Sequence, residues 1–284
     1  MSTQRKRPHA TSAQSSRARS FERQGTQPPA SGNAAETFID RHLGEGRGAK
    51  VAIRTLAREV TYAELAEQVN RYGNALLQLP VRRGERVLMV VADCPEFFFL
   101  FWGAIKAGII PVPLNTLLRA NDLAFIVRDS SCKSLIYSDE FLAEVSAALA
   151  TPGQPAIDAR SIVKGENSLS QLARTASPVL KAVNIDADDD CVWLYSSGTT
   201  GEPIGMVHRH GDFAVTCRNY GVATLEARED DVFFSVPRLY FSYGMGMAMT
   251  FPLWVGGTTV VDDRRPTPET VTEVFRACNP TIYA

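Results

Sequence analysis

The sequence has few cysteines and no excess of either charge sign. Its five cysteines are scattered among 284 residues, and none belongs to a C-x-x-C pair. A small fold held together by disulfides is therefore excluded, and buried, reduced thiols in a cytoplasmic protein are expected. The 30 basic side chains nearly balance the 31 acidic ones, so the overall charge does not favour nucleic acid or an anionic membrane as a partner.

A long uninterrupted hydrophobic run is also missing. The longest apolar stretch, from Phe97 to Leu114, is broken by Lys106, Pro111 and Pro113. Its pieces are shorter than the ~20 residues that a membrane-spanning helix needs. The stretch instead predicts a buried helix followed by a short strand, and no membrane partner is expected.

Residues 1–32 differ from the rest in composition. They contain six Lys or Arg and one Glu, and Phe21 is their single large apolar side chain apart from Met1. Such a segment buries too little apolar surface to offset the entropy of ordering it, and it has no apolar core of a secretory signal. The sequence predicts a disordered basic tail over 1–32.

From Asn33 onward, strand-like apolar runs alternate with segments of helical periodicity. Thr61 and Glu64 have the spacing of a capping box, while Pro95 and Gly108 mark the start and stop of the most apolar helix. Strands that alternate with helices predict an α/β fold with doubly wound parallel sheets and flanking helices. The expected helices are 61–79, 95–107, 121–128, 139–149, 211–225, 245–254 and 268–277, and the expected strands are 87–91, 109–112, 134–137, 191–195, 232–236 and 258–261.

A stretch rich in Pro, Gly and Ser, from Thr151 to about Pro178, is predicted to be a loop or linker. It suggests a first α/β subdomain over 33–180 and a second over 181–284. The second is expected to be incomplete at its C-terminus, because the chain stops at Ala284 within a strand-like run.

One loop carries the residues that a polyphosphate would need. Two apolar strands are separated by a segment that offers four hydroxyls and two glycines: Ser196, Ser197, Gly198, Thr199, Thr200 and Gly201. Neutral donors and close backbone approach suit phosphate binding, although the segment is not a Walker A loop. From these residues alone, an ordinary Ser/Thr/Gly surface turn is an equal alternative.

This loop and its surroundings resemble the phosphate-binding signature of the adenylate-forming acyl-CoA synthetases, and further segments narrow the resemblance to the benzoate-CoA ligase branch. The likeness runs from about Asn33 to the end of the chain. The matching segments are Tyr195–Gly205 with Met206–His210, Phe38–Leu43, Thr61–Tyr62, Gly84–Met89, Gly103–Gly108, Pro111–Leu118, Phe241–Gly246, Arg265–Glu269 and Asn279–Thr281.

The resemblance implies a fold that is part of the large N-terminal domain of these enzymes, and it implies two-step chemistry. An aromatic carboxylate, benzoate or a close analogue, attacks ATP to form an acyl-adenylate, and the thiol of coenzyme A then displaces AMP. Residues 196–201 would hold the leaving phosphates, with Thr199 and Thr200 nearest phosphate or Mg2+ and Thr200 as the metal-side residue. The small-molecule partners would be the aromatic acid, ATP and CoA, and no catalytic residue is assigned within this chain.

The same resemblance points to an acid-binding pocket. Tyr240 would stand between the nucleotide and acid sites, and Tyr243 and Gly244 would border the aryl ring. His210 is expected to enter a helix or to face the pocket. Without the resemblance, the run of aromatic residues and the methionines that follow it are better explained as core.

Two features depart from the family pattern. Ile204 stands where these enzymes normally hold a lysine, and a neutral side chain adds no charge against pyrophosphate. Family members are also nearly twice this length, so the chain is predicted to be a truncated N-terminal portion. Two alternatives stay open: a synthetase for a different carboxylic acid, and a catalytically inactive module that binds nucleotide or acid.

Overall fold

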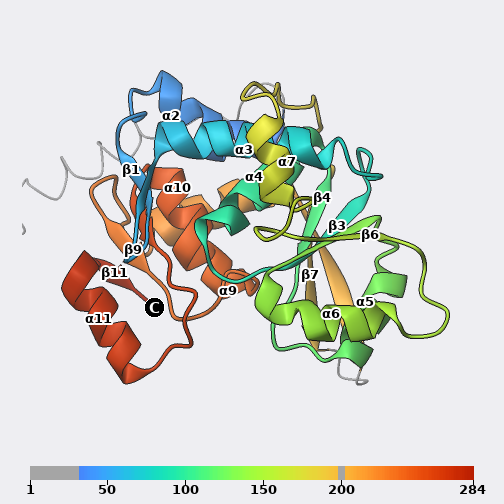
Figure 1. Cartoon of the computed structure of the whole chain (residues 1–284). Coiled ribbons are helices and arrows are strands. Elements are labelled where there is room, and N and C mark those ends of the chain that lie inside the picture. Colours follow the sequence, from blue (N-terminus) through green and yellow to red (C-terminus); the bar gives the residue numbers. More distant parts are fainter. Residues whose placement is uncertain (1–31, 198–201) are drawn as a thin grey trace, which may run out of the picture. The chain divides into compact units, whose positions relative to one another are not determined.

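A computed structural model describes residues 32–197 and 202–284 of the chain. The predicted tail lies outside the described residues except for Gly32, as does the centre of the phosphate loop, 198–201. The described residues form one compact unit, built around two mainly parallel sheets and a separate two-stranded hairpin. The α/β class with flanking helices is thus confirmed (Figure 1).

The first sheet, sheet B, is wholly parallel and is covered by helices on both faces. Successive residues of its second strand alternate between two hydrophobic clusters: Val87 and Met89 face one cluster, while Leu88 and Val90 face the other. This period of two is what a strand buried on both faces requires. The strand order is β4 (Ile110–Pro113), β3 (Arg86–Val90), β5 (Ser134–Tyr137) and β6 (Asp158–Ser161).

Two helices cover each face of sheet B. Residues of α3 (Tyr62–Leu76) and α4 (Pro95–Ala107) belong to the first cluster, and residues of α5 (Ala120–Asp129) and α6 (Leu142–Leu149) belong to the second. Figure 1 shows α5 and α6 beneath the sheet and α3 and α4 above it. The short 3-10 turn η3 (Asp139–Phe141) leads into α6.

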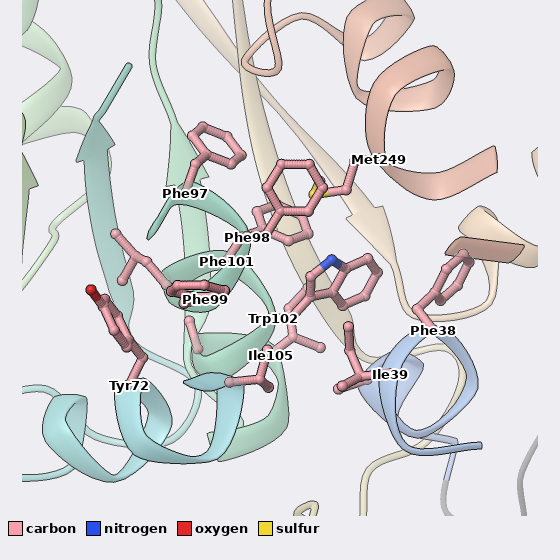
Figure 2. Packing of buried hydrophobic residues seen from close by; sticks show 14 of the residues in the cluster. Phe38, Ile39, Tyr72, Phe97, Phe98, Phe99, Phe101, Trp102, Ile105 and Met249 are labelled. Atoms are coloured by element: carbon pink, nitrogen blue, oxygen red, sulfur yellow. The ribbon is translucent and has the colours of Figure 1, made fainter. Parts of the chain in front are cut away.

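Helix α4 is the apolar helix that the sequence predicted over 95–107, and every residue of it except Glu96 is buried. Figure 2 shows its aromatic side chains projecting in several directions toward neighbouring elements. The Trp102 ring stacks on Phe38 at a centroid distance of 4.9 Å, and Phe101 meets Trp102 edge to face at 5.2 Å. An element that is apolar all round is stable only with neighbours on every side.

The second sheet, sheet A, combines strands from both ends of the described chain. Strand β1 pairs in parallel with β10, more than 200 residues away, and antiparallel with β2. The strand order is β11 (Ile282–Tyr283), β9 (Val232–Phe234), β10 (Thr258–Val260), β1 (Val51–Arg54) and β2 (Glu59–Thr61). The division into subdomains at 180/181 stays a prediction, and sheet A takes strands from either side of it.

The faces of sheet A are also both covered. Phe233 points into the large cluster that contains α4, whereas Phe234 and Val260 pack with Val274 of α11 on the opposite face. The remaining helical elements are η2 (Glu36–Asp40), α2 (Arg41–Gly44), α7 (Leu169–Thr175), α8 (Asp212–Thr216), η4 (Cys217–Val222), α9 (Ser242–Met245), η5 (Gly246–Thr250), α10 (Phe251–Val255) and α11 (Pro268–Cys278), of which η2, η4 and η5 are π-helical.

The signals at the helix ends act as the sequence predicts. Thr61 accepts a hydrogen bond from the backbone N–H of Glu64, and the Glu64 carboxylate accepts one from Thr61, which completes the capping box. Gly108 ends α4 with a φ of 76°, a left-handed conformation that favours glycine.

Two expectations from the sequence are wrong in detail. The supposed linker contains β6 and α7, because Asp158–Ser161 extends sheet B and Ser168 caps a short helix. The strand expected after the predicted phosphate loop is β8 (Pro203–Arg209), but it pairs antiparallel with β7 (Asp190–Ser197) instead of continuing the parallel sheets. Short elements with few apolar residues carry little periodicity, so tertiary pairing decides them.

Candidate functional site

An open cleft of about 1220 Å³ lies where several strands of both sheets end. Its walls come from the segments after β3, β4, β9 and β10, which are the carboxyl ends of parallel strands. Ligands of open α/β sheets bind at this edge, since the loops that leave the strands converge there. The cleft is therefore the first candidate for a binding site.

Aromatic side chains form one wall of the cleft. Tyr240 and Phe241 lie in contact, with ring centroids 4.6 Å apart, and Tyr243 follows two residues after Phe241. Tyr240 is only 7% exposed, whereas Tyr243 is 51% exposed. Burial raises the pKa of Tyr240, and its neutral phenol can donate a hydrogen bond. The wall suits a flat apolar group.

Gly244 lies behind this aromatic wall and packs against the backbone of the preceding loop. A side chain at this position would collide with the backbone carbonyl oxygens of Pro237 and Arg238. Gly244 is buried and is not among the residues that line the cleft. Its role in the structure is to let the start of α9 pack against the loop after β9.

Two charged side chains in the cleft are tied to each other. Asp93, directly after β3, is buried, and its Oδ2 lies 3.6 Å from Nη1 of Arg238. Burial raises the pKa of Asp93 to about 6, although the neighbouring Arg238 acts in the opposite direction. Arg238 also donates to the backbone carbonyls of Asp262 and Arg264, at 2.8 and 2.6 Å, so its donors are engaged within the protein.

Arg265 is the other cation on the cleft wall. It is exposed and forms no ion pair with another residue of the described ranges. An anionic group that enters the cleft would find this guanidinium available.

The predicted phosphate loop, residues 196–201, runs in sequence from the end of strand β7 toward strand β8 of the hairpin. Ser196 is exposed near the end of β7 and stands directly opposite Ile204 across the hairpin, while the backbone of Ser197 pairs with Pro203. Ile204 is 52% exposed, so the side chain at this position reaches solvent beside the loop. Gly198, Thr199, Thr200 and Gly201 lie outside the described residues, and with them the predicted magnesium position.

The hairpin is anchored to helix α5 and to strand β3. The Tyr195 hydroxyl donates to the Asp129 carboxylate at the end of α5, and the Trp193 ring packs 5.2 Å from the guanidinium of Arg86. Gly205 lies across from Tyr195, where an added Cβ would sit 3.1 Å from the ring. These contacts fix the position of the hairpin strands on either side of residues 198–201.

His210 does not line the cleft. It is 5% exposed, and its Nδ1 accepts a hydrogen bond from the backbone N–H of Ala34 at 3.2 Å. Burial lowers its pKa to about 4, and Asp189 acts weakly against this shift. The structure thus places His210 before α8, as a neutral side chain that ties the start of the compact unit to the end of β8.

Metal ligands do not cluster in the described part of the chain. No three His, Cys, Asp or Glu side chains within it gather in a way that could hold a metal ion. Across the same ranges, no helix combines the length and apolar character needed to cross a membrane.

Sequence reasoning found the segment from Tyr240 to Tyr243 but missed Asp93 and Leu117, which line the same cleft. Asp93 could have been predicted from the sequence, because it is a charged residue that follows an apolar run typical of a buried strand. Leu117 is 77% exposed in a loop, and nothing in its local sequence marks it.

Comparison with known proteins identifies the family. Residues 40–284 match the family model described as AMP-binding enzyme, so the chain belongs to this family. It is similar to the benzoate–CoA ligase of Thauera aromatica, with 41% identity over 254 residues that cover 88% of this chain and 48% of that protein. The family resemblance inferred from the motifs is confirmed.

Two solved structures share the fold. The benzoate CoA ligase from Burkholderia xenovorans LB400 matches with a TM-score of 0.80 and 33% identity, over 88% of this chain and 49% of that one. An anthranilate CoA ligase in complex with anthranoyl-AMP matches with a TM-score of 0.81 and 32% identity, over 90% and 50%. The chain spans about half the length of the relatives it matches.

Proposed function

We propose that this chain forms the acid-binding and phosphate-binding portion of an AMP-forming acid–thiol ligase. The substrate is an aromatic carboxylate, benzoate or a close analogue, which is activated to the acyl-adenylate and then transferred to coenzyme A. The observation that carries the proposal is the cleft at the carboxyl ends of the strands, with Tyr240, Phe241 and Tyr243 on its wall. Relatives that act on benzoate and anthranilate support the aromatic class.

The cleft accounts for recognition of both ends of such an acid. The aromatic wall offers ring faces and edges to a flat group, and contact between aromatic rings adds to the gain from burying apolar area. Arg265 is the available cation for the carboxylate, because the donors of Arg238 are used by backbone carbonyls and by Asp93. The phenol of Tyr240, which lines the cleft, can donate a hydrogen bond to a substrate oxygen.

The residues at the end of the β7–β8 hairpin fit a polyphosphate. Ser196 is exposed near the end of β7, and the sequence that follows is rich in hydroxyl groups and glycine. Bound Mg-ATP supplies the electrophilic phosphorus and the pyrophosphate leaving group; Thr200 is the proposed metal-side residue. The role of this chain is to hold the phosphates with neutral donors fixed in advance. Reduced thiols and the nature of the substrates favour a cytoplasmic location.

Ile204 favours a second candidate, a module that binds acid or nucleotide without turning it over. Its side chain stands opposite Ser196, beside the loop, where the family normally provides a positive charge. A neutral group there weakens the attraction for pyrophosphate but leaves the acid cleft unchanged.

Calorimetric titration of the full chain with benzoate, cyclohexanecarboxylate and octanoate tests the proposal. We expect benzoate to bind most tightly, and Tyr243→Ala to weaken its binding. Tyr220→Ala is the matched control, since Tyr220 is a comparably exposed tyrosine that lies outside the cleft. Equal affinity for the three acids, or an unchanged affinity in Tyr243→Ala, would contradict the aromatic assignment.

A further inference from the structure

The segment that carries the aromatic wall is held at its start by a buried aspartate. Oδ1 of Asp93 accepts a hydrogen bond from the backbone N–H of Leu239 at 3.3 Å, and Oδ2 faces the Arg238 guanidinium. The two oxygens therefore contact two consecutive residues directly before Tyr240. Because Asp93 follows β3 and Arg238 follows β9, this contact also joins the loops of sheet B and sheet A.

Arg238 extends the connection to a third loop. Its guanidinium donates to the carbonyl oxygens of Asp262 and Arg264, which follow β10. The carboxylate and guanidinium together link three of the loops that form the cleft, at the point where the chain turns into the Tyr240–Tyr243 wall.

A neutral side chain in place of Asp93 would avoid the free-energy cost of burying a charge. The side chain is 8% exposed, and the charged groups that face it are Arg238 on one side and Asp263 on another, with the Tyr240 phenol nearby. Burial of a carboxylate carries a desolvation cost that one partly exposed cation does not fully offset. Charged groups kept in such places are concentrated at functional sites.

We propose that Asp93 is a positioning residue of the acid site: it fixes the segment from Arg238 to Gly244 and so sets the rings of Tyr240 and Tyr243 against the aromatic group of the substrate. This inference rests on the proposed function for the identity of the ligand. The claim that Asp93 fixes this segment depends only on the contacts of Asp93 with Arg238 and Leu239.

Substitution of Asp93 by asparagine distinguishes a residue that positions the aromatic wall from one that only stabilises the fold. An amide has one oxygen, so it can accept from Leu239 or face Arg238, but it must then turn its NH2 group toward the other donor. Asp93→Asn therefore removes the double contact while it also removes the cost of the buried charge. The variant is expected to be at least as stable as the parent protein at about pH 8 and yet to bind the ligand less well.

The experiment measures three quantities on the full chain and on Asp93→Asn. They are the urea midpoint, the affinity for benzoate between about pH 5 and pH 8, and amide hydrogen exchange of Leu239–Gly244. We expect an unchanged or higher midpoint, about tenfold weaker benzoate binding at pH 8, and faster exchange of these amides. Benzoate affinity of the parent protein should fall as the pH drops through about 6, and this step should be missing in the variant.

Asp158→Asn is the matched control. Asp158 also pairs with an arginine, Arg160, but it lies in β6 and does not line the cleft. Its substitution should leave benzoate binding and the exchange of Leu239–Gly244 unchanged.

The outcomes separate the two proposals. Parent-like benzoate binding in Asp93→Asn overturns the positioning role, and so does a loss of binding that merely follows a loss of stability. If the parent chain itself binds no benzoate, the proposed function fails. The exchange of Leu239–Gly244 then still decides the role of Asp93: faster exchange in the variant supports it, and unchanged exchange overturns it.

Discussion

His42 and His210 are both buried, and both are held in the neutral form by their surroundings. Burial lowers the pKa of His42 to about 3, with a further contribution from Arg41 and Arg47, and lowers that of His210 to about 4. The unfolded chain takes up protons on these rings below their ordinary pKa of 6.5, whereas the folded chain does not. Acid therefore favours unfolding, and the stability that the neutral rings provide is lost as the pH falls below that value.

The pH dependence of unfolding should reveal this contribution. Each histidine should cost about 1.4 kcal/mol of unfolding free energy per pH unit between about pH 6 and the pKa of the folded state. Asp93 has the opposite effect on stability. Its raised pKa means that the folded chain binds this proton more tightly than the unfolded chain, so this group adds unfolding free energy as the pH falls from about 6 toward its ordinary pKa of 3.8.

The variants His42→Gln and His210→Asn provide the measurement. Gln can keep the donor toward the carbonyl of Leu253, and Asn can keep the acceptor for Ala34. Urea unfolding from pH 8 to about pH 4.5 should show a shallower acid loss in each variant than in the parent chain. Parallel curves for parent and variants would contradict the assignment of neutral, buried rings.

Ile204 permits a direct test of the phosphate loop. Lysine at this position would stand opposite Ser196 and add a charge beside the loop, so Ile204→Lys should bind ATP more tightly. The position is half exposed, so the gain should be about 0.2–1 kcal/mol, at most about a fivefold change in Kd.

Calorimetry with ATP at low and high salt measures this gain, and Ile204→Gln is the neutral control. The increase should shrink at high salt, because an exposed charge is screened. An ATP affinity in the lysine variant that is equal to or weaker than that of the glutamine variant would count against this loop as the phosphate site.

At the scale of single elements, helices α3 and α4 approach so closely that they leave no room for a side chain at their crossing. A Cβ added to Gly103 would lie 2.8 Å from the backbone nitrogen of Gly73 and 2.9 Å from the carbonyl oxygen of Val69. Both neighbours are backbone atoms, so the helices themselves would have to separate. The contact explains why the most apolar helix of the chain contains a glycine in its middle.

Gly103→Ala should therefore destabilise the chain by about 1–3 kcal/mol, despite the higher helix propensity of alanine. Gly44→Ala is the matched control, because Gly44 is also helical and an added Cβ there meets nothing within 4 Å. Urea unfolding monitored by circular dichroism compares the two. A neutral or stabilising effect of Gly103→Ala would show that the two helices can move apart at little cost.

At the scale of the whole compact unit, sheet A binds the two ends of the described chain together. Strand β1 has β10 as one neighbour, and the Phe38 ring packs against both Phe213 and Trp254. A cut after residue 180 leaves the β1 edge unpaired and exposes this aromatic cluster to water. Such edges and apolar patches promote association between chains.

A fragment of residues 1–180 should accordingly fail to unfold cooperatively and should aggregate, and addition of a 181–284 fragment should restore a cooperative transition. Thermal unfolding with sedimentation measures both properties. A soluble 1–180 fragment with its own sharp transition would instead support an independent first subdomain over 33–180.

Periodicity and end signals were sufficient to predict the long elements and the fold class. The alternating faces of β3, the capping box of α3 and the Pro95–Gly108 limits of α4 are local properties, so the sequence alone determines them. The motif series was likewise sufficient to predict the family, because it consists of residues in order along the chain.

Only the tertiary structure decided which segments meet. The antiparallel pairing of β7 with β8, the place of β6 in sheet B and the contact of Asp93 with Arg238 join residues whose local sequences do not specify their partners. The same holds for His210: the sequence left open whether it enters a helix or faces the pocket, and the structure places it before α8 and against Ala34. Contacts between distant segments depend on how sheets and helices pack, and a pattern read within one segment carries no information about the partner that packing brings to it.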